Sequence, residues 1–279
     1  MAQKLIYITN DPQVARIAEA AGTGRVFVDM EYIGKDRRQG GLDTVQLHHT
    51  PQDVRNIRGA IFAAELLVRI NPIHDAGPDF SSTEEEIEAV IAAGADLIML
   101  PYYKTRAEAE RFLSAVDGRA KTVLLLETPQ AADHLDEILA LPGIDEMYIG
   151  LNDLSIGYGK KFLFELLADG TVEALAGKIR AAGLPFGFGG IAKPGGGALP
   201  AERIIREQVR LGSTRAILSR AFLNSQKEKD PEKIKDIFES GIRGIRAAEE
   251  EARNAPEAFF EENRRELKKT VAKIVEGLG

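Results

Sequence analysis

Two carboxylates follow apolar runs in the middle of the sequence. Glu127 comes directly after four aliphatic residues, and Asp153 follows the next apolar run along the chain. A charge at the end of a buried run costs free energy unless it is paired or bound to a cation. Neighbouring strands lie ~4.8 Å apart, so the two side chains could share one hard cation, Mg²⁺ or Mn²⁺. The alternative is that Glu127 pairs with Arg69 while Asp153 caps a helix.

A second group of candidates is cationic. Arg69 ends another apolar run, and its planar donor fork suits a substrate carboxylate or a developing enolate, although it could instead pair with an acidic neighbour. A glycine-flanked loop carries Lys35, Arg37 and Arg38, which could bind a phosphate or a second carboxylate. The alternatives for this loop are a solvated surface or contacts with a neighbouring subunit.

Three weaker candidates accompany these residues. Lys193 follows an apolar run, where a Schiff-base lysine could act, but its glycine-rich loop would orient it poorly. The glycines within residues 187–190 could bind phosphate or simply allow close backbone approach. His48 and His49 precede a helix start, and we favour a role in helix entry over metal binding because adjacent side chains point apart.

These residues need a scaffold that brings strand ends together. Most apolar runs in the chain are continuous, as in strands buried on both faces of a parallel sheet. Each run is followed by a loop and an amphipathic helix, in a unit of roughly 25–30 residues, which predicts an α/β protein with a (β/α)8 TIM barrel. A doubly wound open sheet is the alternative. The expected strands are Lys4–Thr9, Arg25–Glu31, Glu65–Asn71, Asp96–Pro101, Lys121–Glu127, Asp145–Gly150, Phe186–Ile191 and Arg215–Ser219.

The end of the chain differs in character from the rest. Residues 225–279 are highly charged, with apolar residues at helical spacing on both sides of Pro256. We therefore divide the chain into a barrel, residues 1–224, and a C-terminal helical extension, residues 225–279. One helix of the extension would serve as the eighth helix of the barrel. The apolar stripe from Ile234 to Ile245 would pack on its own domain or on another subunit.

Composition excludes several classes of protein. The chain has 279 residues, of which 44% are hydrophobic, so it can bury a large core and is not intrinsically disordered. Its net charge of −7 disfavours a general nucleic-acid binder, and the absence of cysteine excludes disulfides and thiolate chemistry. No apolar run approaches the ~20 residues of a membrane span, and no signal peptide is evident. We expect a cytoplasmic protein with no nucleic-acid or membrane partner.

A sequence signature spans residues 126–155. Leu126-Glu127-Thr128, then Gly143-Ile144-Asp145, then Ile149-Gly150 with Asn152-Asp153-Leu154-Ser155 occur in this order. Their order and spacing resemble the I-E-T, G-V-D and I-G-P-x-D-L-S segments of the HpcH/HpaI aldolase and citrate lyase β family, in the phosphoenolpyruvate/pyruvate barrel superfamily. Weaker similarity extends over roughly residues 5–223.

The resemblance implies a class II metal-dependent aldolase, a carbon–carbon lyase acting on a small 2-oxo acid. Glu127 and Asp153 would bind Mg²⁺ or Mn²⁺, which would chelate a pyruvate-type unit. Arg69 would stabilise the enolate, and backbone amides around Gly150 and Asn152 would hold the substrate carboxylate. The resemblance also implies a homo-oligomer, often with a C-terminal helix exchanged between neighbours.

The chain departs from the family pattern at three positions. Tyr32 stands where the aldolases have a histidine, Ala92 replaces the aspartate paired with that histidine, and Leu151 replaces the proline of I-G-P. Tyr32, His48 or His49 could take over proton transfer, although tyrosine, with a pKa near ~10, is a poor base. The alternative functions are therefore a catalytically degenerate, anion-binding member of the family and a structural subunit of a larger complex.

Overall fold

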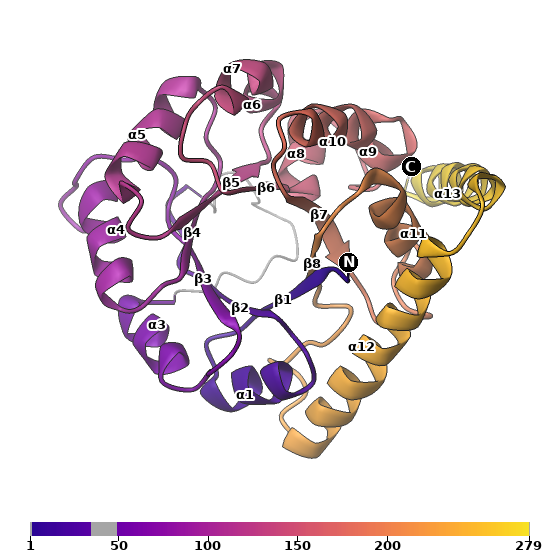
Figure 1. The fold of residues 1–279 in the computed structure, drawn as a ribbon, viewed down its shortest axis with the longest axis horizontal. Helices are drawn as coiled ribbons and strands as arrows, with labels where there is room; N and C mark the ends of the chain where they lie inside the picture. Colours follow the sequence, from indigo (N-terminus) through magenta and orange to yellow (C-terminus); the bar gives the residue numbers. More distant parts are fainter. Residues whose placement is uncertain (1, 35–48, 279) are drawn as a thin grey trace.

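The computed structural model describes residues 2–34 and 49–278. Eight parallel strands pair in chain order, and β8 closes on β1 to form a barrel (Figure 1). The observed topology confirms the predicted TIM barrel and excludes a doubly wound open sheet. The strands are β1 Lys4–Ile8, β2 Arg25–Asp29, β3 Glu65–Arg69, β4 Leu97–Leu100, β5 Lys121–Leu126, β6 Glu146–Ile149, β7 Phe186–Ile191 and β8 Arg215–Leu218.

Helices surround the barrel and begin largely where the sequence carries capping residues. Thr50, Ser82 and Thr105 each form a capping box at the start of a helix. None of the helices in the described ranges is long and apolar enough to cross a membrane. The helices are α1 Pro12–Ala20, α3 Pro51–Arg58, α4 Thr83–Ala92, α5 Arg106–Val116, α6 Pro129–Asp133, α7 Leu135–Leu139, α8 Leu151–Gly157, α9 Glu165–Ala168, α10 Thr171–Ala181, α11 Ala201–Leu211, α12 Pro231–Arg253 and α13 Glu257–Gly277.

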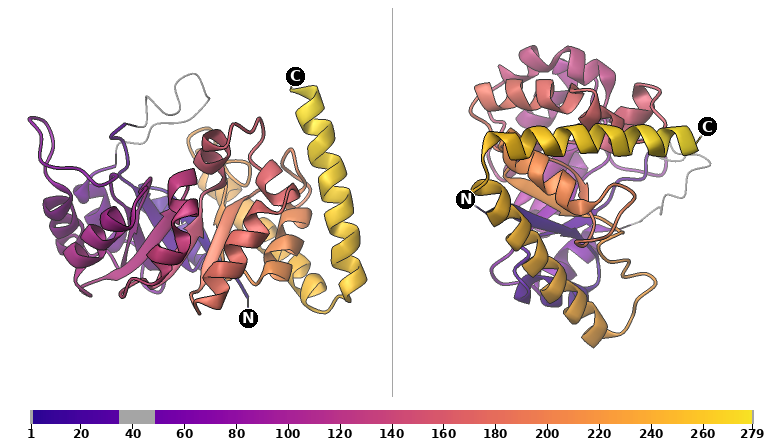
Figure 2. Two further views of the ribbon diagram at one scale, coloured as in Figure 1. Left: turned by 90° about the horizontal axis from the view of Figure 1, so that it is seen from above. Right: turned by 90° about the vertical axis from the view of Figure 1, so that its right-hand side faces the viewer.

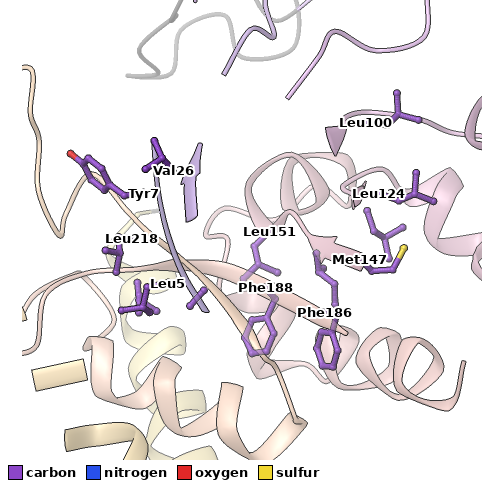
Figure 3. Packing of buried hydrophobic residues seen from close by; sticks show 14 of the residues in the cluster. Leu5, Tyr7, Val26, Leu100, Leu124, Met147, Leu151, Phe186, Phe188 and Leu218 are labelled. Carbon is purple, nitrogen blue, oxygen red and sulfur yellow. The ribbon is translucent and has the colours of Figure 1, made fainter. Parts of the chain in front are cut away.

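Alternate residues of each strand face the inside of the barrel and form layers. The middle layer is apolar, and its members include Ile6, Phe27, Leu67, Val123 and Tyr148, which form a cluster of their own. The intervening residues face outward and join the larger cluster beneath the helices, part of which is shown in Figure 3. Both faces of each strand are therefore buried, which explains why the runs in the sequence are continuous rather than alternating.

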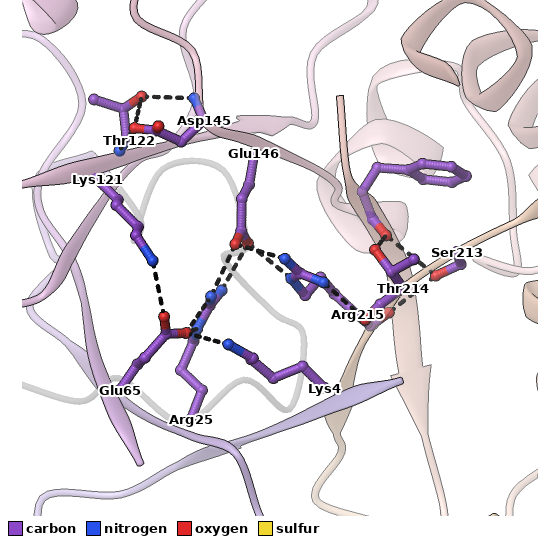
Figure 4. Close-up of polar contacts among 11 residues, drawn as sticks. Lys4, Arg25, Glu65, Lys121, Thr122, Asp145, Glu146, Ser213, Thr214 and Arg215 are labelled. Carbon is purple, nitrogen blue, oxygen red and sulfur yellow. Dashed lines mark hydrogen bonds and ion pairs between the residues drawn. The ribbon is translucent and has the colours of Figure 1, made fainter. Parts of the chain in front are cut away.

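The layer at the amino ends of the strands is charged (Figure 4). Arg25, which is 1% exposed, contacts Glu146 at 2.8 Å and Glu65 at 2.7 Å. Burial alone would raise the pKa of Glu65, but its hydrogen bonds to Lys4 and Arg25 lower it to about 2. The pKa of Glu146 is also lowered to about 2, because Arg25 and Arg215 outweigh its burial. This charged layer closes the end of the barrel opposite the strand carboxyl ends.

The two C-terminal helices pack on the barrel of their own chain. The long helix α12 contacts α11 and α1, so it occupies the position of the eighth barrel helix. The last helix, α13, packs on the outer side of α11 and also contacts α9 (Figures 1 and 2). The predicted apolar stripe is buried here, with Ile234, Phe238, Ile242 and Ile245 each at most 5% exposed. Of the two packing alternatives for this stripe, the structure shows the one within a single chain. Helix exchange and oligomerisation remain predictions.

Candidate active site

A cavity of about 570 Å³ opens at the carboxyl ends of the strands. Its volume lies in the range of small-molecule sites. The residues that line it come from the ends of most strands and from the loops that follow them. They include Asp29, His49, Arg69, Glu127, Gly150, Asn152 and Asp153. The structure therefore brings the predicted acidic residues and Arg69 to one cavity.

Glu127 lies just beyond β5, two residues after the inward-facing Leu125, so it continues the inner face of that strand. Its side chain is 4% exposed, and its Oε1 accepts a hydrogen bond from the backbone N–H of Tyr102 at 2.9 Å. Tyr102 has a φ of 50°, an uncommon conformation for a residue with a side chain. A strained backbone position therefore helps to hold this carboxylate.

Gly150 ends the neighbouring strand β6 and leaves room for Glu127. A Cβ atom at Gly150 would lie 2.8 Å from Oε2 of Glu127 and 2.9 Å from its Cβ. The backbone N–H of Gly150 donates to the carbonyl of Leu126 at 2.9 Å, so it is engaged in strand pairing. The contribution of Gly150 to the site is thus the space that it leaves, and any substrate-binding amide must come from the residues that follow.

Asp153 lies in the first turn of α8, directly after β6. It is 9% exposed, and Asn152 Nδ2 donates to its Oδ1 at 3.1 Å. Because β5 and β6 pair in register up to Leu126 and Ile149, the segments that carry Glu127 and Asp153 leave the barrel side by side.

The donor chemistry of this corner fits Mg²⁺ or Mn²⁺. Two carboxylates, Glu127 and Asp153, line one cavity. The missing side chain of Gly150 leaves space beside the Glu127 carboxylate. In the described residues no group of three or more His, Cys, Asp or Glu side chains could hold a metal ion. A cation held here would thus take two protein carboxylates and complete its shell with water or substrate, as Mg²⁺ commonly does.

Arg69 supplies a fixed positive charge to the same cavity. Its Cα is paired in register with that of Asp29 on β2, and its Nε and Nη2 donate to the Asp29 carboxylate at 2.8 and 2.7 Å. Nη2 also lies 3.3 Å from Glu31. Burial alone would lower the pKa of Arg69, but Asp29 and Glu31 raise it above its usual value. Arg69 therefore stays charged and is held by an acidic neighbour while it lines the cavity.

His49 is the site residue that the sequence interpretation undervalued. It is 6% exposed, it lines the cavity, and its Nδ1 accepts the backbone N–H of Asp29 at 3.1 Å. An imidazole that accepts at Nδ1 carries its proton at Nε2. The helix-entry role also holds, because His49 precedes Thr50, the N-cap of α3. The sequence does not show that the residue before α3 contacts the end of β2; this contact becomes apparent only in the folded structure.

Tyr32 lies at the edge of this arrangement. It is 39% exposed and is not among the residues that line the cavity. Its backbone N–H donates to Asn71 Oδ1 at 2.9 Å, and Asn71 Nδ2 donates to the buried Glu86 at 2.9 Å. Partial burial and the Glu86 carboxylate raise the pKa of Tyr32, which makes it a weaker acid than free tyrosine. Asn71 and Glu86 are positioning residues that no sequence motif indicated.

The remaining candidates have mixed outcomes. Lys193 is exposed and does not line the cavity. Gly187 fits the close-approach alternative, because a Cβ there would lie 2.5 Å from Tyr148, whereas Gly189 and Gly190 line the cavity. The cationic residues Lys35, Arg37 and Arg38, together with His48, lie outside the described residues.

Several known proteins are similar to this chain in sequence or in fold. A hydroxypyruvate/pyruvate aldolase of Rhizorhabdus wittichii RW1 is 26% identical over 163 residues, which cover 47% of this chain and 62% of that protein, so less than two thirds of the relative is matched. A solved HpcH/HpaI aldolase of Desulfitobacterium hafniense DCB-2 has a TM-score of 0.58 at 16% identity, covering 78% of this chain and 86% of that chain.

A solved HpcH/HpaI aldolase/citrate lyase family protein of Burkholderia cenocepacia J2315 has a TM-score of 0.61 at 15% identity, covering 91% of this chain and 95% of that chain. At such identities the solved structures show a shared fold only. The sequence profile of the HpcH/HpaI aldolase/citrate lyase family matches residues 5–166. Since that range is more than half of the sequence, the chain belongs to the HpcH/HpaI aldolase/citrate lyase family.

Proposed function

We propose that this protein is a class II aldolase that forms or cleaves a carbon–carbon bond to the enolate of a pyruvate-type 2-oxo acid. The observation that carries the proposal is that Glu127, Asp153 and Arg69, from three strand ends, line one cavity. Family membership and the name of the Rhizorhabdus relative support the reaction class. Glu127 and Asp153 would hold Mg²⁺ or Mn²⁺, and the bound ion would supply Lewis-acid polarisation of the keto group.

Arg69 stabilises negative charge on the substrate in this proposal. Asp29 fixes its guanidinium through two hydrogen bonds, so the group needs no reorganisation when an enolate forms. Because burial is outweighed by Asp29 and Glu31, which raise the pKa of Arg69 above its usual value, the guanidinium is charged at neutral pH. Asn152 and Asp153 lie at the same edge, and their backbone amides are the proposed contacts for the substrate carboxylate. Lys35, Arg37 and Arg38 remain predicted substrate contacts.

His49 acts as a hydrogen-bond donor in our proposal rather than as a proton carrier. With Nδ1 accepting from Asp29, the proton at Nε2 can be shared with a substrate oxygen. Its complete transfer from the neutral ring would leave an anionic imidazole, so donation without transfer is the available role. Tyr32 remains a predicted catalytic residue, but its exposure and raised pKa make it the weaker choice.

Two partial reactions test the metal site without requiring the natural partner aldehyde. Exchange of the pyruvate methyl protons in deuterated water, followed by nuclear magnetic resonance, reports enolate formation, and oxaloacetate decarboxylation reports the same intermediate. Both should require Mg²⁺ or Mn²⁺ and stop with a chelator. The variants Glu127→Gln and Asp153→Asn should lower both rates about 100-fold or more and weaken metal binding in calorimetry.

Asp136→Asn is the matched control, because Asp136 is exposed, pairs with Lys178 and is not among the cavity residues. It should keep full activity. If the wild-type protein neither binds these metals nor exchanges pyruvate protons, the result would support the alternative function, a catalytically degenerate, anion-binding protein. The replacement of the family's histidine and aspartate by Tyr32 and Ala92 is the basis of that alternative. Full turnover in either ligand variant would show that the metal assignment is wrong.

A further inference from the structure

The cavity extends well beyond the corner that holds Glu127 and Asp153. Between positions 154 and 218, every described residue that lines it is aliphatic, aromatic or glycine. We call this part of the wall, together with Leu151, the apolar wall. Its large side chains are Leu151, Phe162, Leu163, Phe164, Leu199 and Leu218.

The apolar wall is packed before any ligand binds. Leu151, Phe164 and Leu199 are 2%, 7% and 1% exposed. Phe162 and Phe164 meet edge to face, with ring centroids 5.4 Å apart. A Cβ atom at Gly189 would lie 3.3 Å from Leu151 and 3.7 Å from Phe164, so the glycine brings both side chains against the end of β7. Leu151 and Phe188 of β7 belong to the same buried cluster, part of which Figure 3 shows. A wall held in this way offers a preformed apolar surface.

Among the described residues, the charged side chains that line the cavity lie outside the apolar wall. The described charged side chains are Asp29, Arg69, Glu127 and Asp153 at the ends of β2, β3, β5 and β6, and Arg220 after β8. Arg220 is exposed at the rim. The loops after β7 and β8 of TIM barrels frequently bind phosphate, but here an anion against the apolar wall would lose hydration and would meet no charged partner among the described residues of the wall.

Resting on the proposed aldolase function, we propose that the apolar wall is the subsite for the carbonyl partner, and that this partner is an uncharged aldehyde with an aliphatic or aromatic substituent. The enolate carbon of the 2-oxo acid forms a bond to the aldehyde carbon. The carbonyl electron pair moves to the aldehyde oxygen, which takes up a proton, and the product is a 4-hydroxy-2-oxo acid. Cleavage is the reverse of these changes. The substituent packs against Leu151, Phe162 and Phe164.

A series of acceptor aldehydes tests the proposal. With pyruvate and Mg²⁺ held constant, kcat/KM should rise about threefold per methylene from acetaldehyde to pentanal, as burial of each group predicts. Benzaldehyde should also be accepted. Glycolaldehyde, glyceraldehyde 3-phosphate and glyoxylate should be at least tenfold poorer than pentanal. A hydroxylated or anionic aldehyde that equals or exceeds pentanal would overturn the proposal.

Phe162→Ser is the variant that isolates the wall, because Phe162 is only half-buried and its loss should leave the fold intact. It should flatten the chain-length dependence while leaving pyruvate proton exchange unchanged. Phe62→Ser is the matched control: Phe62 is 87% exposed, precedes the amino end of β3, and does not line the cavity. A variant Phe162→Ser that keeps the wild-type chain-length dependence would count against the wall.

Two readouts separate this inference from the proposed function. If wild-type protein exchanges pyruvate protons but shows no preference for apolar acceptors, the subsite is wrong and the aldolase proposal stands. If no exchange occurs, binding of the unreactive alcohol 1-hexanol still tests the wall by calorimetry. Saturable binding that Phe162→Ser weakens and Phe62→Ser leaves unchanged would support an apolar subsite, and no binding would refute it.

Discussion

Replacing Arg25 with methionine tests whether the charged layer at the closed end of the barrel stabilises the fold. The guanidinium makes four hydrogen bonds of 2.7–3.2 Å to Glu65 and Glu146. Methionine has a similar length but no charge, so it leaves two largely buried carboxylates without this partner. Arg25 lies in the layer opposite the proposed active site, so activity below the unfolding temperature should be unchanged.

The expected loss follows from burial. Removing one member of a buried ion pair costs about 3–5 kcal/mol. Glu65 keeps Lys4 and Lys121, and Glu146 keeps Arg215, so we expect the lower end of that range, about 3 kcal/mol. For a domain of this size the loss corresponds to a fall in Tm of roughly 6–12 °C.

Lys121→Met is the matched control in the same network. Lys121 lies 3.1 Å from Glu65, but its side chain is 58% exposed, so its loss should cost about 1 kcal/mol or less. Urea unfolding monitored by circular dichroism measures both variants. An Arg25→Met protein within 1 kcal/mol of wild type, or a Lys121→Met protein as unstable as Arg25→Met, would refute the reasoning.

Three further predictions concern acid stability and the site. Because the folded-state pKa values of Glu65 and Glu146 are about 2, below the usual 4.5, their stabilisation is complete above pH ~5 and is lost as the pH falls towards 2; urea midpoints should therefore drop below pH ~5, and glutamine at both positions should flatten that drop. Gly150→Ala should displace the neighbouring glutamate and weaken Mn²⁺ binding about 10–100-fold by calorimetry, whereas Gly177→Ala, where a Cβ meets open space, should not. Asn71→Ala removes the acceptor for two backbone N–H groups after β2, so pyruvate exchange should slow about tenfold with a Tm loss of only a few degrees; unchanged exchange would show that this loop does not position the site.

The barrel could be predicted because each of its strands is encoded by a short, continuous stretch of the sequence. Most strands are continuous apolar runs, and the expected strand from 121 to 127 differs from β5 by one residue. The break between α9 and α10 falls at Asp169 and Gly170, where Gly170 adopts a φ of 93° that glycine tolerates. The short helix α8 was not predicted, since it begins after Gly150 without a side-chain cap.

The parts of the site that could not be predicted depend on contacts between distant segments. Asn71 meets Glu86 across 15 positions, and His49 meets Asp29 across 20, and neither pair has a sequence pattern of its own. Glu127 could be proposed because it directly follows a buried run, and Asp153 because it lies four residues after the end of the next run, both within a recognisable motif. The location of a residue at the cavity could thus be predicted from sequence where a strand end alone places it.

The described residues just after β2 and those just before α3 are held by different contacts. On one side, Asn71 accepts from the backbone of Tyr32 and Ile33. On the other, Asp29 holds His49, and the capping box of Thr50 and Asp53 fixes the start of α3. His49 is thus joined to the end of β2 on one side and to the capped start of α3 on the other, so two separate elements of the described scaffold set its place in the cavity.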